Sequence, residues 1–225
     1  MTKEQYKKIE KYMLENVDEN AHDSYHIYRV LNNALIIANK YKNINYEILI
    51  TSCLLHDIAR NKQRIDSTIC HAQEGGNMAY QFLIKNNYSN EFALAVKECI
   101  TTHRFRSNNE PKTIEAKILF DADKLDVIGP LGIARTLLYN GALNNPLYLM
   151  DENDKIDYGL NLASKDSFLK EYNYKLKKLY NKFYTSKAKQ LSKKYKKTTS
   201  LFYNDLIKQI NIDDLNNQLI AKKFK

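Results

Sequence analysis

The sequence predicts an all-α protein, and two observations carry that prediction. Of the 225 residues only six are glycine and three are proline, so signals for turns are sparse. No segment sustains the alternation of apolar and polar residues that is typical of half-buried strands. With 44% hydrophobic residues, helices can bury a substantial core. We therefore expect a helical bundle.

The first two helices are indicated by a cap and by periodicity. Thr2 and Gln5 have the spacing of a capping box, which predicts a helix over residues 2–17. A second helix is expected over residues 23–41, because apolar residues recur there with a helical period on one face. That face carries Val30, Leu31, Ala34, Leu35 and Ala38.

The central part of the chain predicts further helices in close succession. Asn45 can cap a third helix that ends near His56 and Asp57. The other helices are expected over residues 71–85, 91–102, 113–126 and 131–140, the last with Gly141 as its C-terminal stop.

The C-terminal part looks different from the rest. Residues 141–164 lack periodicity and contain a proline and a glycine, so we expect one long connection there. A long helix over residues 166–195 and one or two shorter helices should complete the chain. We therefore predict a core of residues 1–140 and a helical extension of residues 141–225 that packs on it.

Charge is unevenly distributed along the chain. The net charge is +9, and residues 165–225 hold 16 lysines against five acidic residues, whereas residues 1–164 hold 19 basic and 21 acidic residues. Such a basic segment could bind nucleic acid or an anionic substrate. It is also typical of a solvated, lysine-rich helical face, and the composition leaves both interpretations open.

The N-terminus and the cysteines indicate the compartment. The opening MTKEQYKKIEKY has no apolar signal segment, and no run of 18 uncharged apolar residues occurs, so we expect a cytoplasmic protein without a membrane span. Cys53, Cys70 and Cys99 have no CxxC spacing and cannot all pair. Reduced thiols without a chemical role fit this pattern.

The stretch LLHDIAR, residues 54–60, sets a histidine and an aspartate at the end of an apolar run. Burying both side chains is costly unless partners or a metal ion compensate. One interpretation is a helix C-terminus, where histidine interacts favourably with the helix dipole and aspartate caps the next turn. The alternative is a metal site.

The positions of the remaining histidines favour the metal site. All five histidines lie in the first half of the chain, in the segments HDSYH, LLHDIAR, ICHAQ and CITTHRFRS, and KILFDADKLDVIG follows them. This order of histidines, a His-Asp pair and a helical aspartate resembles the HD-domain phosphohydrolase superfamily. The segments DADKLDVIGPLGIARTLLYNGALNNPLY and HDSYHIYRVLNNA resemble a bacterial branch of stand-alone HD hydrolases that includes nucleotide pyrophosphohydrolases.

The resemblance implies a helical HD-domain bundle and a specific ligand set. Its metal ligands would be His26, His56, Asp57 and Asp123, with Asp123 preferred to Asp121 because ADKL matches the usual ADxL pattern. Two imidazoles and two carboxylates suit a divalent Mn, Fe, Co, Ni, Zn or Mg ion.

Other residues near the motifs have more than one expected role. His71 and His103 match positions that bind a second metal ion or contact substrate phosphate in some superfamily members. We expect phosphate binding or proton transfer, with a second metal site or a buried core position as the alternatives. Asp126 is expected to take part in catalysis or to orient a ligand from one helical turn beyond Asp123. Arg60, Lys124 and Arg29 are the expected substrate-binding residues, with Arg104 and Arg106 as weaker candidates. For Asp121 we expect a cap or a surface position, and for His22 an N-terminal helix position.

We therefore expect a metal-dependent phosphohydrolase. The resemblance implies hydrolysis of nucleoside triphosphates to monophosphate and pyrophosphate by attack of metal-bound water. A nucleoside monophosphate phosphatase and a cyclic phosphodiesterase are alternatives with the same metal chemistry. A nucleotide-sensing or nucleic-acid-binding module that uses the basic tail is an alternative of another class.

Overall fold

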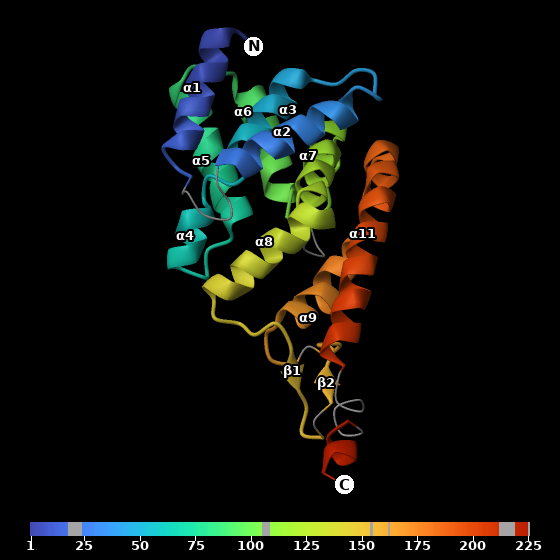
Figure 1. The fold of residues 1–225 in the computed structure, drawn as a ribbon. Coiled ribbons are helices and arrows are strands. Elements are labelled where there is room, and N and C mark those ends of the chain that lie inside the picture. The colour runs from blue at the N-terminus through green and yellow to red at the C-terminus, as the bar shows by residue number, and fades with distance from the viewer. Residues whose placement is uncertain (18–23, 105–108, 154, 162, 212–218, 225) are drawn as a thin grey trace. The chain divides into compact units, whose positions relative to one another are not determined.

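The structure is a computed structural model that describes residues 1–17, 24–104, 109–153, 155–161, 163–211 and 219–224. Helices account for most of these residues, which confirms the all-α prediction (Figure 1). In that part of the chain no helix has the length and apolar character to cross a bilayer. The elements in chain order are α1 (Lys3–Leu14), α2 (Ser24–Ala38), α3 (Tyr46–Leu55), α4 (Arg60–Ile65), α5 (His71–Lys85), α6 (Asn90–Thr102), α7 (Ile114–Leu125), α8 (Gly129–Ala142), β1 (Leu149–Met150), β2 (Ile156–Asp157), α9 (Phe168–Lys170), the π-helix η1 (Glu171–Leu176), α10 (Lys177–Leu179) and α11 (Ser186–Ile210).

The chain forms two compact units. The first unit comprises Met1–Asp126 together with Lys182–Leu191, and the second comprises Val127–Asn181 and Ser192–Lys225. The sequence-based division into residues 1–140 and 141–225 stays a prediction. The first unit contains all of the predicted site residues that the structure describes.

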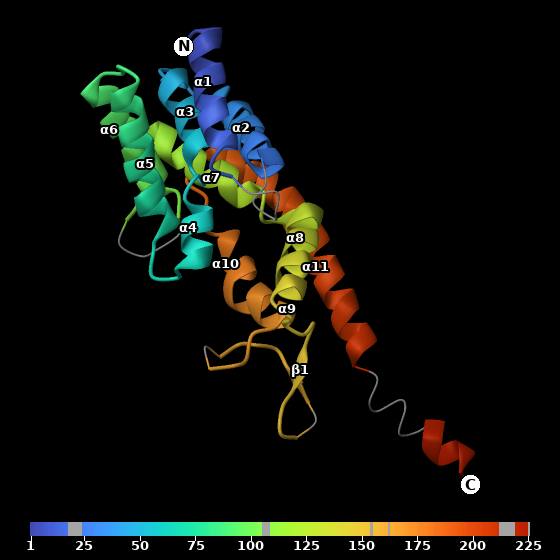
Figure 2. The ribbon, with the colours of Figure 1, turned by 90° about the vertical axis from the view of Figure 1, so that its left-hand side faces the viewer.

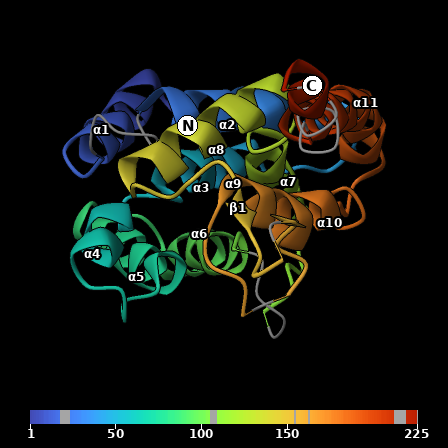
Figure 3. The same cartoon turned by 60° about the horizontal axis from the view of Figure 1, so that its bottom comes forward.

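The core of the first unit is built by α1, α2, α3, α5 and α6. Its centre is fully buried and apolar, and α5 and α6 pair side by side over their length (Figure 2). The short α4 lies next to α5 (Figure 3). The members of this core include Ile9, Met13, Ile27, Leu54, Leu55, Leu83, Val96 and Ile100.

Of the two adjacent glycines of α5, Gly76 permits this close packing. A Cβ on Gly76 would lie 2.7 Å from Cγ2 of Thr101 on α6, which is closer than side chains tolerate. A Cβ on Gly75 would lie 3.5 Å from the carbonyl oxygen of His56. Gly76 therefore allows α5 and α6 to approach each other, and the close approach is a packing feature.

Local capping signals define several helix starts. Thr2 and Gln5 form the predicted capping box, with Gln5 N–H donating to Oγ1 of Thr2 at 3.2 Å and Thr2 N–H donating to Oε1 of Gln5 at 2.7 Å. Oδ1 of Asn45 accepts from the N–H groups of Glu47 and Ile48, each at 3.1 Å, which confirms the predicted cap of α3.

The prediction of one helix over residues 166–195 is wrong. The chain there forms α9, η1 and α10, and α11 begins only at Ser186. The break coincides with a tertiary contact within the first unit: the buried carboxylate of Asp121 accepts from the N–H groups of Tyr184 and Thr185 at 2.9 and 2.7 Å, and from the Thr185 hydroxyl at 2.5 Å. Oγ1 of Thr185 in turn accepts from Ala188 N–H and caps α11.

Three smaller features also differ from expectation. The six-residue helix α4 was not predicted, and the connection after residue 141 contains the antiparallel pair β1 and β2, in register Leu149↔Asp157. Gly141 does not end α8, which continues to Ala142. Asn144 adopts φ of 55° just beyond the helix, the left-handed conformation that glycine or asparagine supplies at helix ends.

The second unit is held together by aromatic contacts. The rings of Tyr172 and Tyr203 stack with centroids 4.0 Å apart, and the Phe168 ring meets that of Phe202 edge-on at 6.3 Å. Gly129, with φ of 72°, lies against the Tyr195 ring, and the N–H of Gly129 donates to Thr199 Oγ1. These contacts join α8, η1 and α11 within the second unit.

Candidate metal centre

Four histidines and three aspartates meet at one place in the first unit. Each of these side chains is almost fully buried. His26 comes from α2, His56 and Asp57 from the C-terminal end of α3, His71 from the first position of α5, His103 from the end of α6, and Asp123 and Asp126 from the end of α7. Helix ends suit such a cluster because side chains there can turn toward a common point.

The carboxylate of Asp57 is the centre of the cluster. Its Oδ2 lies 3.6 Å from Nε2 of His26 and 3.7 Å from Nε2 of His56. Its Oδ1 lies 3.5 Å from Nε2 of His71 and also 3.5 Å from Nε2 of His103. One carboxylate therefore faces two pairs of imidazole nitrogens, one pair on each oxygen.

Two groups of metal-ligating side chains result. In each group, one potential ligand atom per residue lies within 4.8 Å of the others. The groups are His26 with His56 and Asp123, and Asp57 with His71 and His103. The first group and Asp57 together are the four ligands that the sequence predicted.

Hydrogen bonds at the opposite ring nitrogen orient all four imidazoles. Each Nδ1 lies within hydrogen-bond distance of an oxygen, and with the proton on Nδ1 the Nε2 lone pair faces the other ligands, where the Nε2 atoms of His71 and His103 lie 3.3 Å apart. The acceptors are Oδ2 of Asp126 for His26 (2.7 Å), the Cys53 carbonyl for His56 (2.8 Å), Oε1 of Gln63 for His71 (2.5 Å) and the Ile100 carbonyl for His103 (2.6 Å).

The separations in the cluster fit shared cations better than direct hydrogen bonds. Distances of 3.5 to 3.7 Å between Nε2 atoms and the Asp57 oxygens exceed the hydrogen-bond range. Two ligands about 2.1 Å from one ion at the tetrahedral angle would lie about 3.4 Å apart. Nε2 of His56 is buried and has no hydrogen-bond partner among the described residues. The donor set therefore fits one or two divalent cations.

Burial keeps His56 and His71 neutral, as metal ligands must be. Desolvation lowers the pKa of His56 from 6.5 to about 4, and it lowers the pKa of His71 from 6.5 to about 2. For Asp123, burial alone would raise the pKa, but Lys124 and the nearby imidazoles outweigh it and hold the pKa well below 3.8. At neutral pH His56 and His71 thus offer imidazole lone pairs, and Asp123 offers an ionised carboxylate.

Asp126 contacts the cluster through the Nδ1 side of the His26 ring. Its Oδ2 accepts from Nδ1 of His26, and its Oδ1 accepts from Nε of Arg29 at 2.8 Å. Asp126 therefore contacts a candidate ligand on the side away from Asp57, and we interpret it as a positioning residue. Arg29, predicted to bind substrate, lies against Asp126 in this structure.

The other two predicted substrate-binding residues also lie at the cluster. Nε of Arg60 is 3.1 Å from both carboxylate oxygens of Asp57. Nζ of Lys124 is 2.5 Å from Oδ2 of Asp123 and 3.1 Å from the His103 carbonyl. Both basic groups are thus placed where negative charge from a ligand would accumulate.

Asp121 lies outside this cluster. The expectation of a cap or a surface position is wrong, because Asp121 is buried within α7 and its carboxylate accepts from the N–H groups of Tyr184 and Thr185, which precede α11. His22 and Arg106 lie outside the described residues. Gln63, which orients His71, is a site residue that the sequence did not indicate, because α4 carries no periodic or motif signal.

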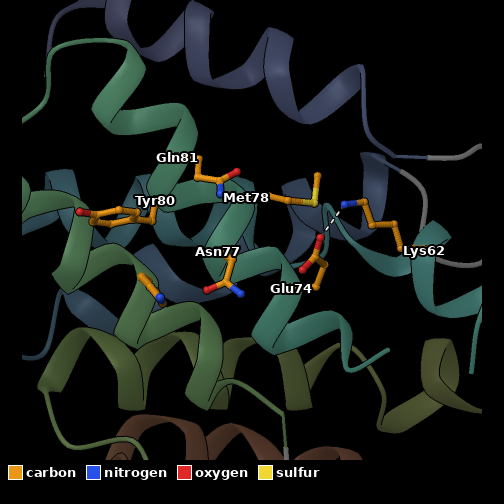
Figure 4. Close-up of a pocket in the computed structure, with 7 residues that line it drawn as sticks. Lys62, Glu74, Asn77, Met78, Tyr80 and Gln81 are labelled. Carbon is orange, nitrogen blue, oxygen red and sulfur yellow. Dashed lines mark hydrogen bonds and ion pairs between the residues drawn. The ribbon is translucent and has the colours of Figure 1, made fainter. Parts of the chain in front are cut away.

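A separate surface pocket lies on the outer side of α5 (Figure 4). Its volume is about 300 Å³, and Lys62 and Glu74 form an ion pair at its edge. The other lining residues are Asn77, Met78, Tyr80, Gln81 and Lys97. None of these side chains belongs to the His/Asp cluster, so this pocket is not the candidate metal centre.

Comparison with known proteins agrees with the cluster. Residues 24–128, which contain every histidine and aspartate of the centre, match the HD domain family. Residues 24–128 are therefore an HD domain. This match confirms the superfamily that the order of the histidine motifs indicated.

Individual relatives support the same HD fold. The chain is 34% identical over 135 residues to YpgQ of Bacillus subtilis (strain 168). The match covers 58% of this chain and 63% of YpgQ, so it spans less than two thirds of that relative. The solved structure of Bacillus subtilis YpgQ in complex with ADP is similar with a TM-score of 0.69 and 28% identity, over 92% of this chain and 98% of that one. An HD-superfamily hydrolase from Bacillus thuringiensis is similar with a TM-score of 0.66 and 28% identity, over 92% and 97% of the two chains.

Proposed function

We propose that this HD domain is a metal-dependent phosphohydrolase that converts nucleoside triphosphates to monophosphates and pyrophosphate. The observation that carries the proposal is the convergence of four imidazole Nε2 atoms on the single carboxylate of Asp57. Support for a nucleotide comes from the relative YpgQ, whose solved structure contains ADP.

We infer which residues hold the cations. His26, His56, Asp57 and Asp123 would bind one divalent ion, and Asp57, His71 and His103 would bind a second. A bound divalent ion supplies Lewis acidity toward water and phosphoryl oxygens. The placement of His71 and His103 on Oδ1 of Asp57 favours the ligand role over the phosphate-binding or proton-transfer role.

The residues of the chain have distinct tasks in this reaction. Asp126 holds the His26 ring, and burial keeps His56 and His71 neutral. Arg60 and Lys124 offset negative charge as the phosphate chain enters. A bond forms between water oxygen and the α-phosphorus, and the bond from that phosphorus to its bridging oxygen breaks. Pyrophosphate leaves with the electron pair, and the proton lost by water passes to solvent.

The product pattern tests the proposal. Metal-stripped protein should be reconstituted with Mn, Co, Ni or Mg and given ribo- and deoxyribonucleoside mono-, di- and triphosphates and cyclic nucleotides. We expect metal-dependent release of pyrophosphate from triphosphates, and loss of both activity and bound metal in Asp57→Asn, because one charged ligand on both cation sites is removed.

Other outcomes identify the alternatives. Release of free phosphate from monophosphates, or opening of cyclic nucleotides, would agree with the proposed metal chemistry but would show that the substrate is not a nucleoside triphosphate. Normal metal content in Asp57→Asn would contradict the ligand assignment. Metal binding without any product would favour a nucleotide-sensing module over an enzyme.

A further inference from the structure

The basic side chains around the metal centre differ in one respect, their pairing with carboxylates. Three of them lie against an acidic side chain of the cluster, so each already has a carboxylate partner in the protein itself. These pairs are Arg29 with Asp126 (2.8 Å), Arg60 with Asp57 (3.1 Å) and Lys124 with Asp123 (2.5 Å).

Arg104 has no such partner. It is half-buried, and among the described residues no carboxylate forms an ion pair with it. Its contact with another side chain is from Nη1 to Sγ of Cys70 at 3.7 Å. A thiol is a weak acceptor, whereas a guanidinium offers five N–H donors in a planar fork. A partly desolvated cation with so weak a partner indicates that an anion binds there.

The position of Arg104 connects it to the second group of ligands. Arg104 follows His103 at the end of α6, and Cys70 precedes His71 at the start of α5. The guanidinium therefore spans the ends of the two helices that supply these histidines. The start of α5, a helix of 15 residues, adds the partial positive charge of its dipole at this point.

We propose that Arg104 binds the terminal phosphates of the substrate, beyond the phosphate that reacts at the metal centre. This rests on the proposed function and adds a determinant of chain length to it. The Arg104 fork matches two phosphate oxygens, as guanidinium groups do in bidentate contacts. Arg104 is not one of the cation ligands and would contact only phosphates beyond the one at the metal centre. A monophosphate has no such group, so Arg104 would distinguish di- and triphosphates from monophosphates.

The test separates this subsite from the nucleotide specificity. Manganese-loaded full-length protein is titrated with orthophosphate, pyrophosphate and tripolyphosphate in a calorimeter, for the wild type and for Arg104→Gln and Arg104→Lys. We expect Arg104→Gln to weaken pyrophosphate and tripolyphosphate binding about 10-fold or more and orthophosphate binding less than about 2-fold. Arg104→Lys should give an intermediate loss, because it keeps the charge without the fork.

Arg64→Gln is the matched control, since Arg64 is an exposed arginine of α4 and its loss changes the net charge equally. It should bind all three anions as the wild type does, and manganese content should be equal in all variants. Unchanged pyrophosphate affinity in Arg104→Gln, or an equal loss for orthophosphate, would overturn the proposal, as would a wild type that binds neither polyphosphate.

The nucleotide assay is read independently of these titrations. If Arg104→Gln loses polyphosphate affinity while the wild type releases no pyrophosphate from nucleotides, the subsite stands and the proposed function fails. If the wild type releases pyrophosphate from nucleotides and Arg104→Gln does so with unchanged KM and polyphosphate affinity, the proposed function stands and the subsite fails.

Discussion

At the scale of single residues, the centre depends on how each imidazole is held. A histidine binds metal through Nε2 only when Nδ1 carries the proton and the ring points inward. Three of the four Nδ1 acceptors are neutral groups, and only His26 uses a carboxylate, that of Asp126. Asp126 therefore tunes one ligand more strongly than the others, by orienting the ring and raising its basicity.

The first prediction concerns Asp126. Asp126→Asn should weaken manganese binding about 10- to 100-fold, because His26 loses its anionic acceptor. Titration of the metal-free protein with manganese, followed by electron paramagnetic resonance, measures the change. Arg29→Gln is the control, since it removes the other partner of Asp126 and leaves the bond to His26. Equal losses in the two variants would contradict a specific positioning role.

At the scale of elements, two contacts decide how helices meet. One is the approach of α5 to α6 at Gly76, and the other is the attachment of the start of α11 to α7 through Asp121. The first brings His71 and His103 to the same point, because these residues lie at adjoining ends of the two helices. The second joins a segment far along the chain to the helix that carries Asp123.

The second prediction tests the helix approach. Gly76→Ala should destabilise the protein by about 1 to 3 kcal/mol, because the new Cβ would lie 2.7 Å from Cγ2 of Thr101. Gly141→Ala on α8 is the control: nothing lies within 4 Å of its Cβ, so it should stabilise by up to about 1 kcal/mol. Urea unfolding measures both, and equal shifts in the same direction would refute the packing argument.

The third prediction concerns Asp121. Asp121→Asn should destabilise the protein by about 1 to 3 kcal/mol, because one amide cannot accept from the N–H groups of both Tyr184 and Thr185 as a carboxylate does. Thr185→Val keeps both N–H donors to Asp121 and removes the hydroxyl that caps α11, so it measures the contribution of the cap. Hydrogen exchange should show lost protection at the first turn of α11. Retained protection there in Asp121→Asn would mean that other contacts hold the segment.

At the scale of the whole molecule, the buried histidines make stability depend on pH. The folded-state pKa of His56 is about 4 and that of His71 is about 2, against 6.5 for exposed imidazole. Between the folded-state and unfolded-state pKa values the unfolded chain binds more protons than the folded one. The stability that depends on these two neutral imidazoles is therefore fully present above pH 6.5 and is lost as the pH is lowered.

The fourth prediction is the size of that loss. Metal-free protein should lose about 2 kcal/mol of unfolding free energy for each of the two histidines between pH 7 and pH 5. Urea midpoints across this range measure it. His71→Gln should show a shallower pH dependence, since one titrating group is removed. A flat profile for the wild type would mean that these imidazoles are protonated or solvated in the folded state.

The role of the basic C-terminal segment, residues 165–225, is also considered at the scale of the whole molecule. Deleting residues 165–225 would remove Tyr184 and Thr185, the partners of Asp121, as well as the lysines. Substituting exposed lysines of α11 is the cleaner change. We expect Lys193→Gln combined with Lys197→Gln to leave metal content and hydrolysis unchanged. Loss of salt-dependent RNA retention in this variant would instead assign a nucleic-acid-binding role to the segment.

The sequence by itself determined the features that depend on local order. Sparse glycine and proline predicted the helices, and the capping box at Thr2 and the cap at Asn45 have the expected hydrogen bonds. The order of the histidine motifs indicated the superfamily that the family match confirms. These signals are local because caps and helical periodicity involve residues within a few positions of each other.

Only the tertiary structure decided the features that join distant residues. The convergence of His71 and His103 on Oδ1 of Asp57, and the break before α11 at Asp121, join residues that lie far apart in the chain. Neither feature produces a periodic pattern in the sequence, because the packing of the helices decides which side chains meet. The lack of a carboxylate partner for Arg104 within the described part of the chain has the same origin: a sequence displays a charge, and only the fold shows which described carboxylates lie within reach of it.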